Sequence, residues 1–374
     1  MHEKVIVILT IAFLYSCSGE SGANQRITDS VSDTLICLSN DAVSVSISRF
    51  GGAVIEFSFN KNPCNPLSWN VPMNEMPENN NSGAPFQGHF LCIGRWGAPT
   101  PAEIALGIPH NGEPANIWWK NTGSQTQQFA EMEVTATLEQ LHINRRITLS
   151  PDQACWMAEE TLENLQTSGR QTAIVQHATI GTPFLSEQAI VSSNASYGFN
   201  QSLISESLGK YEYKWPTGFA DTLRTQIDLR KSDSKESYVS THIIEDEIGW
   251  ATLANPSEKL LIGYLWKTSD YPWLHIWHGI RDGELRAKGI EFGTTGLGDT
   301  FSPEQRAAIR FHERNNNLFL DNRASVTKKY YCFLLQIPDD FISTDSISFE
   351  ENTIRIKYST KKQLAPVIFD FKVW

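Results

Sequence analysis

Short runs that alternate between polar and apolar residues recur along most of the chain. A period of two over five to eight residues is typical of a half-buried β-strand. Alternating or β-branched runs of this kind occupy Val43–Ser48, Val54–Phe59, Glu133–Thr137, His142–Leu149, Thr172–Val175, Leu260–Leu265, Tyr330–Leu335, Thr353–Tyr358 and Val367–Val373. Clusters of Gly, Pro, Asn and Asp separate the runs. Helical periodicity is clearest at Pro303–Arg310, where Ser302 is expected to cap a short helix.

Many strands with few helices predict an all-β fold, in the form of a large antiparallel β-sandwich or barrel. A chain of 374 residues is long enough for two domains, but large sandwiches often exceed the usual domain size as one unit. No Pro/Ser-rich linker and no internal repeat divides the sequence after residue 33. We therefore expect residues 34–374 to form a single domain.

The amino terminus has the pattern of a bacterial lipoprotein signal. Val5–Tyr15 is an uncharged, mostly apolar run of the kind found in signal peptides, and it is too short to span a bilayer. Leu14 stands three residues before Cys17, and the small Ser16 precedes that cysteine directly. We predict a signal peptide over residues 1–16, lipidation of Cys17 and a flexible polar tether over residues 17–33.

The lipid would then hold the mature protein outside the cytoplasm, in the periplasm or on the cell surface, with no other membrane contact. The alternative is an ordinary secretory signal that happens to contain a cysteine. Five cysteines follow Cys17, and none forms a C-x-x-C pair. Neither a full disulfide framework nor a zinc site is indicated, and no metal is expected.

The overall composition excludes several classes of protein. The chain has 40% hydrophobic and 20% charged residues, which is typical of a globular protein and not of a disordered or polytopic membrane protein. The net charge of −11 argues against nucleic acid as a partner, because phosphate binding needs a dense basic surface. The 11 tryptophans suit a carbohydrate site, since an indole can cover the apolar face of a sugar, although large β cores also use aromatic residues.

Three clusters place ionisable side chains among Gly, Pro and Trp, where binding sites on β scaffolds usually lie. His and Glu are the side chains best suited to proton transfer near neutral pH. The clusters are Gly107–Trp119 with His110, preceded by Arg95; Gln176–Phe184 with His177; and Trp273–Gly296 with His275, Trp277 and Glu291. Trp273, His275 and Trp277 share one face of a strand, either as part of the core or as a sugar platform.

The order of these clusters resembles the galactose mutarotase-like superfamily, which comprises the aldose 1-epimerases and their relatives. The resemblance includes the Phe50–Ile55 segment (FGGAVI), and it extends from about residue 45 to about residue 340. It implies a large antiparallel sandwich of the type called a supersandwich. It also implies an isomerase that opens the ring of an aldose and recloses it as the other anomer, without a cofactor.

Carried over by position, the resemblance assigns a role to five residues. Glu291 is the general base for the anomeric hydroxyl, and His177 is the general acid for the ring oxygen. Arg95 and His110 orient the sugar, and Trp277 is the aromatic wall beside the ring. Asn111, which follows His110 directly, departs from the family pattern, and we assign no position to the family's active-site Asp.

Two other functions remain open at the level of the sequence. A catalytically silent carbohydrate-binding lipoprotein would keep the binding residues without turnover. A polysaccharide lyase or hydrolase is also conceivable on a related sandwich, although a hydrolase normally needs two carboxylates. In every case we expect a monomer whose partner is a small-molecule sugar.

Overall fold

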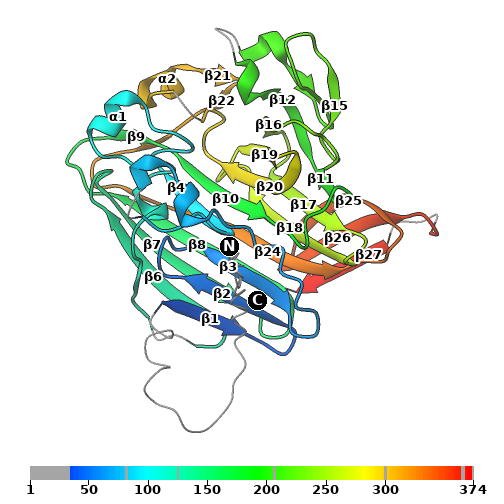
Figure 1. Ribbon diagram of the computed structural model, residues 1–374. Helices are drawn as coiled ribbons and strands as arrows, with labels where there is room; N and C mark the ends of the chain where they lie inside the picture. The colour runs from blue at the N-terminus through cyan, green and yellow to red at the C-terminus, as the bar shows by residue number, and fades with distance from the viewer. Residues whose placement is uncertain are drawn as a thin grey trace, which may run out of the picture.

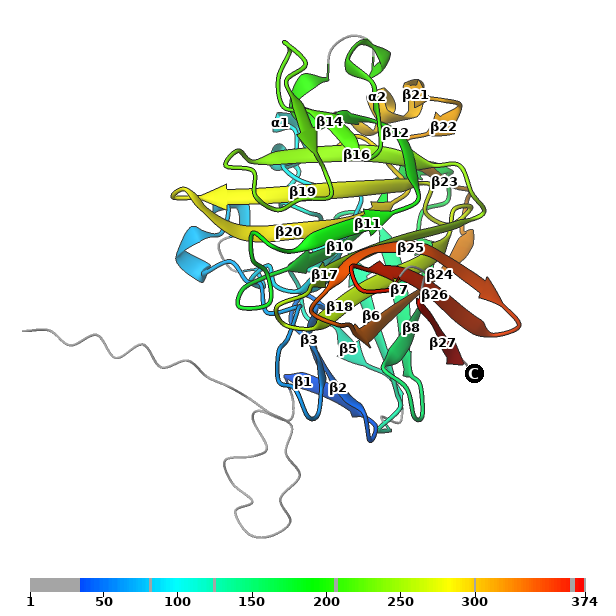
Figure 2. The ribbon, with the colours of Figure 1, turned by 90° about the vertical axis from the view of Figure 1, so that its right-hand side faces the viewer.

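The computed structural model describes residues 34–80, 83–123, 126–204, 208–298, 301–363 and 367–372. The predicted signal peptide, the tether and Cys17 lie outside these ranges. Two large antiparallel sheets dominate the described residues and pack face to face (Figures 1 and 2). No helix in the described part of the chain is long and apolar enough to cross a membrane. The predicted all-β fold with large antiparallel sheets is confirmed.

The larger sheet has ten strands and carries the site described below. In sheet order they are β1 (Leu35–Ser39), β2 (Val43–Ser48), β3 (Val54–Phe59), β4 (His89–Ile93), β10 (Ile174–Ile180), β20 (Glu284–Gly293), β19 (Trp273–Arg281), β16 (Tyr238–Ile244), β12 (Ala195–Asn200) and β13 (Tyr213–Lys214).

The smaller of the two sheets has eight strands and covers one face of the larger one. In sheet order they are β11 (Ile190–Ser193), β17 (Ile248–Asn255), β18 (Leu260–Lys267), β24 (Ser325–Gln336), β8 (Cys155–Asn164), β7 (Leu141–Leu149), β6 (Phe129–Ala136) and β5 (Lys120–Asn121).

Small elements complete the described fold. A three-stranded sheet of β25 (Phe341–Glu350), β26 (Thr353–Thr360) and β27 (Val367–Lys372) projects at one side (Figure 1). The strand pairs are β14 (Thr217–Phe219) with β15 (Gln226–Asp228), β21 (Arg310–Phe311) with β22 (Arg314–Asn315), and β23 (Leu318–Leu320) with β9 (Arg170–Thr172). The helices are α1 (Pro101–Ala105), α2 (Pro303–Ala308) and the 3₁₀ turns η1 (Met73–Glu75), η2 (Glu78–Asn80), η3 (Glu113–Ala115), η4 (Gln201–Leu203) and η5 (Leu208–Tyr211).

Alternation along the strands separates the core from the site. On β20, Ile290 and Phe292 belong to the hydrophobic core between the two large sheets. Glu291 lies between them and therefore points to the opposite face of the ten-stranded sheet. On the neighbouring β10, Ala178 and Ile180 belong to the same core, whereas His177 faces the other way. The strands that form the core thus also carry the polar residues of the opposite face.

The Gly51–Gly52 pair of the FGGAVI segment lies in the turn that joins β2 to β3. Both glycines have positive φ, 81° and 63°, a region that other residues rarely adopt. A Cβ atom on Gly52 would also lie 2.5 Å from Cε2 of Trp119. The close packing of a buried indole against the backbone therefore requires glycine at this position.

The alternation pattern located β2 and β3 with their full bounds and the whole of β27 within the run 367–373, and it located parts of β6, β7, β18, β24 and β26. Ser302 caps α2 through a capping box with Gln305, as the sequence predicts, although the helix ends at Ala308. The predicted strand Thr172–Val175 is wrong as one element, because β9 ends at Thr172 and β10 begins at Ile174.

Candidate active site

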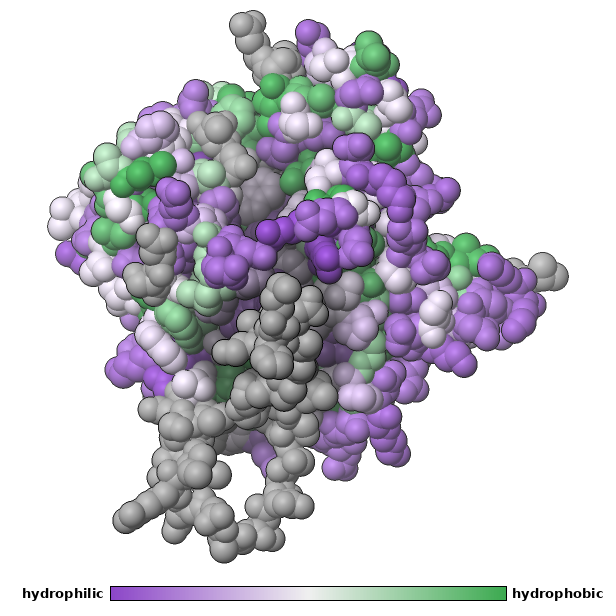
Figure 3. Space-filling model, viewed as in Figure 1, coloured by the Kyte–Doolittle hydropathy of each residue, from purple (hydrophilic) through white to green (hydrophobic). Residues whose placement is uncertain are grey.

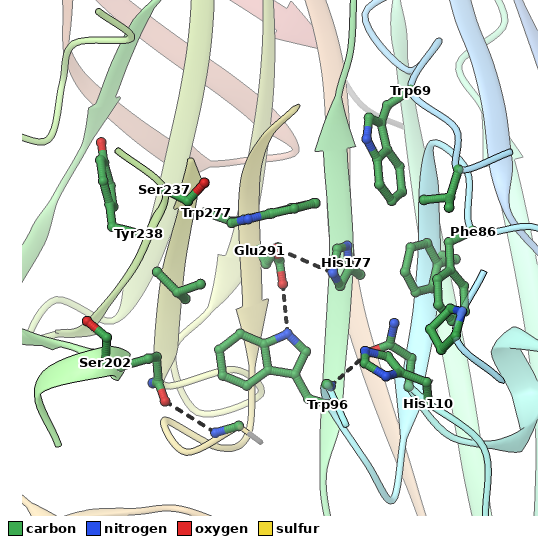
Figure 4. A pocket seen from close by; sticks show the side chains of 18 of the residues that line it. Trp69, Phe86, Trp96, His110, His177, Ser202, Ser237, Tyr238, Trp277 and Glu291 are labelled. Carbon is green, nitrogen blue, oxygen red and sulfur yellow. Dashed lines mark hydrogen bonds and ion pairs between the residues drawn. The ribbon is translucent and has the colours of Figure 1, made fainter. Parts of the chain in front are cut away.

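A cavity of about 720 Å³ opens on the face of the ten-stranded sheet that points away from the eight-stranded sheet. Figure 3 shows a hollow in this face of the molecule, bordered by hydrophilic residues. Side chains from the strands form its floor, and loops between the strands supply its walls (Figure 4). Four of the residues singled out in the sequence line it: His110, His177, Trp277 and Glu291.

The floor is a row of side chains that crosses adjacent strands of the sheet. Phe90 on β4 pairs with His177 on β10, and Glu291 on β20 pairs with His275 on β19. The register of β10 with β20, in which Val175 opposes Gly293, places His177 opposite Glu291. Residues separated by 114 positions in the sequence therefore become cross-strand neighbours.

Glu291 is buried, with 1% of its surface exposed. One carboxyl oxygen accepts a hydrogen bond of 2.9 Å from the indole N–H of Trp96. Burial penalises the charged form and raises the pKa of Glu291 to about 8, although the Trp96 hydrogen bond acts in the opposite direction. A pKa of about 8 favours the protonated carboxyl at neutral pH.

His177 faces the other carboxyl oxygen of Glu291. Its Nε2 lies 3.6 Å from Oε1 of Glu291, and its Nδ1 lies 2.8 Å from the hydroxyl of Thr179. The imidazole stacks on Phe90 with the ring centroids 4.4 Å apart, which fixes the orientation of the ring. Burial, together with the nearby His110, lowers the pKa of His177 to about 3. The histidine is therefore neutral at pH 7, with Nε2 directed toward Glu291.

Trp96 owes its position to a second buried histidine. The Trp96 indole packs against His275 at a centroid distance of 4.0 Å, and Nδ1 of His275 lies 3.0 Å from the hydroxyl of Thr241. Thr241 in turn accepts a hydrogen bond from Gln201, which lines the cavity. This chain of contacts holds the indole N–H in line with Glu291.

Aromatic side chains form the wall above the pair. Trp277 lies edge-on to His177 at 5.8 Å and edge-on to Trp69 at 5.6 Å. In the view of Figure 4, Glu291 lies between Trp277 and Trp96. Such a wall offers flat apolar surfaces beside a buried proton-transfer pair, which is the combination that a pyranose ring needs.

His110 reaches the cavity from a loop on the other side. Its main-chain N–H bonds to Asn80 and its carbonyl accepts from Asn116, so the backbone is held at both ends. The next residue, Asn111, has a φ of 62° and accepts a bond from the main chain of Gly97. Asn111, which departs from the family pattern, therefore fastens the His110 loop to the Trp96 loop.

Arg95 is not among the residues that line the cavity, so the structure does not bring it together with the other four predicted residues. Its side chain is fully buried and forms an ion pair with Glu103 of α1. Positive φ angles at Gly94 and Gly97 (73° and 83°) shape this loop, so that Trp96 points to the cavity and Arg95 to α1. The guanidinium thus anchors the helix that precedes His110.

Several residues that the cavity brings together have no role in the sequence-based interpretation. Trp96 stands next to Arg95 in the motif, but adjacency does not show which side chain turns inward. Trp69, Phe90 and Gln201 lie outside the three clusters that the sequence analysis singled out. Among the described residues, no group of three His, Cys, Asp or Glu side chains has an arrangement suited to a metal ion.

No protein-family model matches this sequence, and no curated protein matches it. Several solved structures match it. A galactose mutarotase related enzyme from Lactobacillus acidophilus has a TM-score of 0.58 at 11% identity, over 82% of this chain and 98% of its own. A galactose mutarotase-like protein from Lactobacillus casei ATCC 334 has a TM-score of 0.56 at 13% identity, over 80% and 100%. A candidate aldose 1-epimerase from Escherichia coli K12 has a TM-score of 0.57 at 12% identity, over 81% of this chain and 99% of its own. The fold is therefore that of the galactose mutarotase-like sandwich.

The Glu291 carboxyl occupies space that glycine leaves free on the same strand. A Cβ atom on Gly289 would lie 2.4 Å from Oε1 of Glu291. We expect Gly289→Ala to fold, because the clash involves the end of a flexible side chain and Ala restricts the unfolded chain more than Gly, by about 0.4–1 kcal/mol. The displaced carboxyl should break its hydrogen bond with Trp96.

The indole N–H signals of the protein in ¹H–¹⁵N NMR test this expectation. The Trp96 signal should shift and its hydrogen exchange should accelerate in Gly289→Ala. The indole of Trp119, which bonds to the carbonyl of Pro114, is an internal control and should not change. An unchanged Trp96 signal in the folded variant would show that the carboxyl does not depend on the space at Gly289.

Proposed function

We propose that this protein is an aldose 1-epimerase, an enzyme that interconverts the two anomers of a free sugar. The observation that carries the proposal is the pair formed by Nε2 of His177 and Oε1 of Glu291, 3.6 Å apart on the floor of an aromatic-walled cavity. Anomer exchange requires one group to take a proton from O1 while another gives a proton to the ring oxygen. A carboxyl and an imidazole within reach of one hemiacetal supply both.

Between pH values of about 3 and about 8, the pair binds one proton in addition to the N–H of the neutral imidazole. At neutral pH that proton belongs to Glu291, because burial raises the pKa of Glu291 to about 8 and lowers that of His177 to about 3. Its transfer to His177 would give a carboxylate beside an imidazolium, the form in which Glu291 acts as base and His177 as acid. Both forms contain the same number of protons, so the pair is best treated as one titrating unit.

The proposed ring opening is balanced in atoms and electrons. Glu291 takes the proton of the O1 hydroxyl, the O1 electrons form the C1=O1 double bond, and the C1–O5 bond breaks. His177 gives its proton to O5, which becomes a hydroxyl. The pair is then back in its resting form, with the proton on Glu291. Rotation about C1–C2 and the reverse transfers close the ring as the other anomer.

The cavity favours an uncharged sugar. Among the described residues that line it, none is Lys or Arg, so no cation is available for a phosphate or a carboxylate. Glu75 and the His177–Glu291 pair are polar, and the aromatic wall of Trp69 and Trp277 suits the apolar face of a ring. The similarity to solved structures described as mutarotase-like and aldose 1-epimerase proteins supports the same substrate class.

The signal pattern that ends at Cys17 places this activity outside the cytoplasm in our proposal. A lipid on Cys17 and the polar segment 17–33 would hold the domain near a membrane surface. An enzyme there would act on sugars before or during their uptake.

Substitution of the pair tests the chemistry. Glu291→Gln keeps the acceptor for the Trp96 indole but cannot take the O1 proton, and His177→Asn cannot protonate O5. Each should lower turnover by about 10²–10⁴-fold, the usual contribution of general acid–base catalysis, with little change in sugar affinity. Polarimetry of freshly dissolved α-glucose, α-galactose and other aldoses measures the rate.

Glu313→Gln is the matched control, because the Glu313 side chain is 94% exposed and is not among the residues that line the cavity. It should retain the wild-type rate. Wild-type rates for Glu291→Gln, on a sugar that the unmodified protein accepts, would show that Glu291 is not the base and would remove the proposed mechanism.

The pH profile should follow the pair. Activity is lost at low pH as a second proton binds His177, whose pKa is about 3, and at high pH as Glu291 loses its proton, with a pKa of about 8. A plateau in kcat/KM should lie between these limbs. Trp96→Phe removes the hydrogen bond that lowers the Glu291 pKa, so the basic limb should move to higher pH. A basic limb that stays in place or moves down contradicts this assignment.

Metabolic labelling tests the anchor. Palmitate should label the unmodified full-length protein and fail to label Cys17→Ser, while Cys64→Ser, which changes a cysteine inside the folded domain, should be labelled normally. Equal labelling of all three proteins would contradict lipidation at Cys17.

A further inference from the structure

A second cavity of about 670 Å³ lies beside the first. The two cavities share part of their walls, namely Trp69, Val71, Glu75, Ser237 and Trp277. The T-shaped pair of Trp69 and Trp277 therefore borders both spaces, with His177 and Glu291 on one side only. The second space continues the proposed active site and is not a separate surface feature.

The β19–β20 hairpin builds this continuation. The two strands meet at Asp282 and Gly283, which both have positive φ (53° and 75°), as the tight hairpin turn of an Asp-Gly pair requires. A register shift at Gly279 and Ile280 interrupts the pairing just before the turn, and such irregularities re-aim the strand end. The tip then directs Arg281 and Arg286 to the second cavity.

Hydrogen-bonding groups line the second cavity, but their charges cancel. Arg281 forms an ion pair with Glu75, and Arg286 forms an ion pair of 2.7 Å with Glu284 on the same strand. Each guanidinium thus already has a carboxylate, and little net charge remains to attract an anion. Ser68 and Asn70 add further polar groups to the lining. This lining suits an uncharged, hydroxyl-rich ligand.

The available space points the same way. Cavities of about 300–1,000 Å³ enclose drug-sized ligands, and the first cavity alone falls in this range at about 720 Å³. A single aldose ring is smaller than such a ligand. With a second cavity of similar volume joined to it along the tryptophan pair, one ring over His177 and Glu291 leaves most of the space unfilled.

We propose that the second cavity is a subsite for the next unit of a neutral oligosaccharide whose reducing-end ring lies over His177 and Glu291. The inference rests on the proposed function, since only the reducing end has the free anomeric carbon that the pair can act on. Trp69 and Trp277 would separate the two sugar units, and Arg281 and Arg286 would bind hydroxyls of the second. The preferred substrates are then short reducing glycans and not single aldoses.

Mutarotation rates of glucose, maltose, cellobiose, laminaribiose and gentiobiose test the subsite, with the matching galactobioses if galactose is the aldose accepted. For at least one disaccharide we expect a kcat/KM about tenfold or more above that of the monosaccharide. Arg286→Ala with Asn70→Ala removes groups that line only the second cavity. This double variant should lose the disaccharide advantage and keep the monosaccharide rate.

Arg146→Ala is the matched control, because Arg146 is an equally exposed arginine that pairs with Glu131 on the other sheet. It should leave all rates unchanged. A monosaccharide rate equal to or above every disaccharide rate overturns the subsite, and so does a double variant that lowers both rates alike. In both outcomes the proposed function stands.

Absence of turnover on every sugar removes the proposed function, and calorimetric binding of the same sugars then decides the subsite. Tighter binding of a disaccharide than of glucose, lost in the double variant, supports the second cavity as a glycan subsite. Equal binding of both, or no binding, overturns it.

Discussion

The buried carboxyl of Glu291 is the constraint on which the site depends. A charged carboxylate out of water costs several kcal/mol unless partners compensate it, and the described neighbours give it only the indole N–H of Trp96 and the neutral ring of His177. The group therefore keeps a proton at rest. Trp96, the His275 ring behind it and the space left at Gly289 all serve to hold this uncharged carboxyl in one place.

The sandwich makes such a buried polar row tolerable. The central strands β4, β10, β20 and β19 give one face to a continuous hydrophobic core and the other to the cavity. The polar floor then sits on a rigid apolar layer, and the row of Phe90, His177, Glu291 and His275 is fixed by strand register and not by loops. Sites on strands are held more precisely than sites on loops, which suits proton transfer over a short distance.

The fold class could be predicted from the sequence. Of the five residues to which the resemblance assigned a role in sugar chemistry, four line one cavity. Strands whose apolar and polar residues alternate in the sequence, such as β2 and β3, can be predicted with their full bounds. Strands buried on both faces, such as β4 and β10, lose the alternation and were missed or cut short. The direction of the Arg95 side chain could not be predicted for another reason: a loop between two glycines with positive φ does not alternate, so the direction of each side chain cannot be read from its neighbours. The contact of Trp96 with Glu291, 195 residues away, leaves no local signal.

The tight Asp282–Gly283 turn has a consequence for how this protein can change over time. One hairpin carries the proposed chemistry on its inner half, at Glu291 and Trp277, and the outer binding surface at its tip. Insertions and exchanges are tolerated best at loop tips. Evolution could therefore lengthen, shorten or replace this turn and change which glycans bind, while the proton-transfer pair stays the same. Exchange of the turn alone between related proteins is then a route to new specificity.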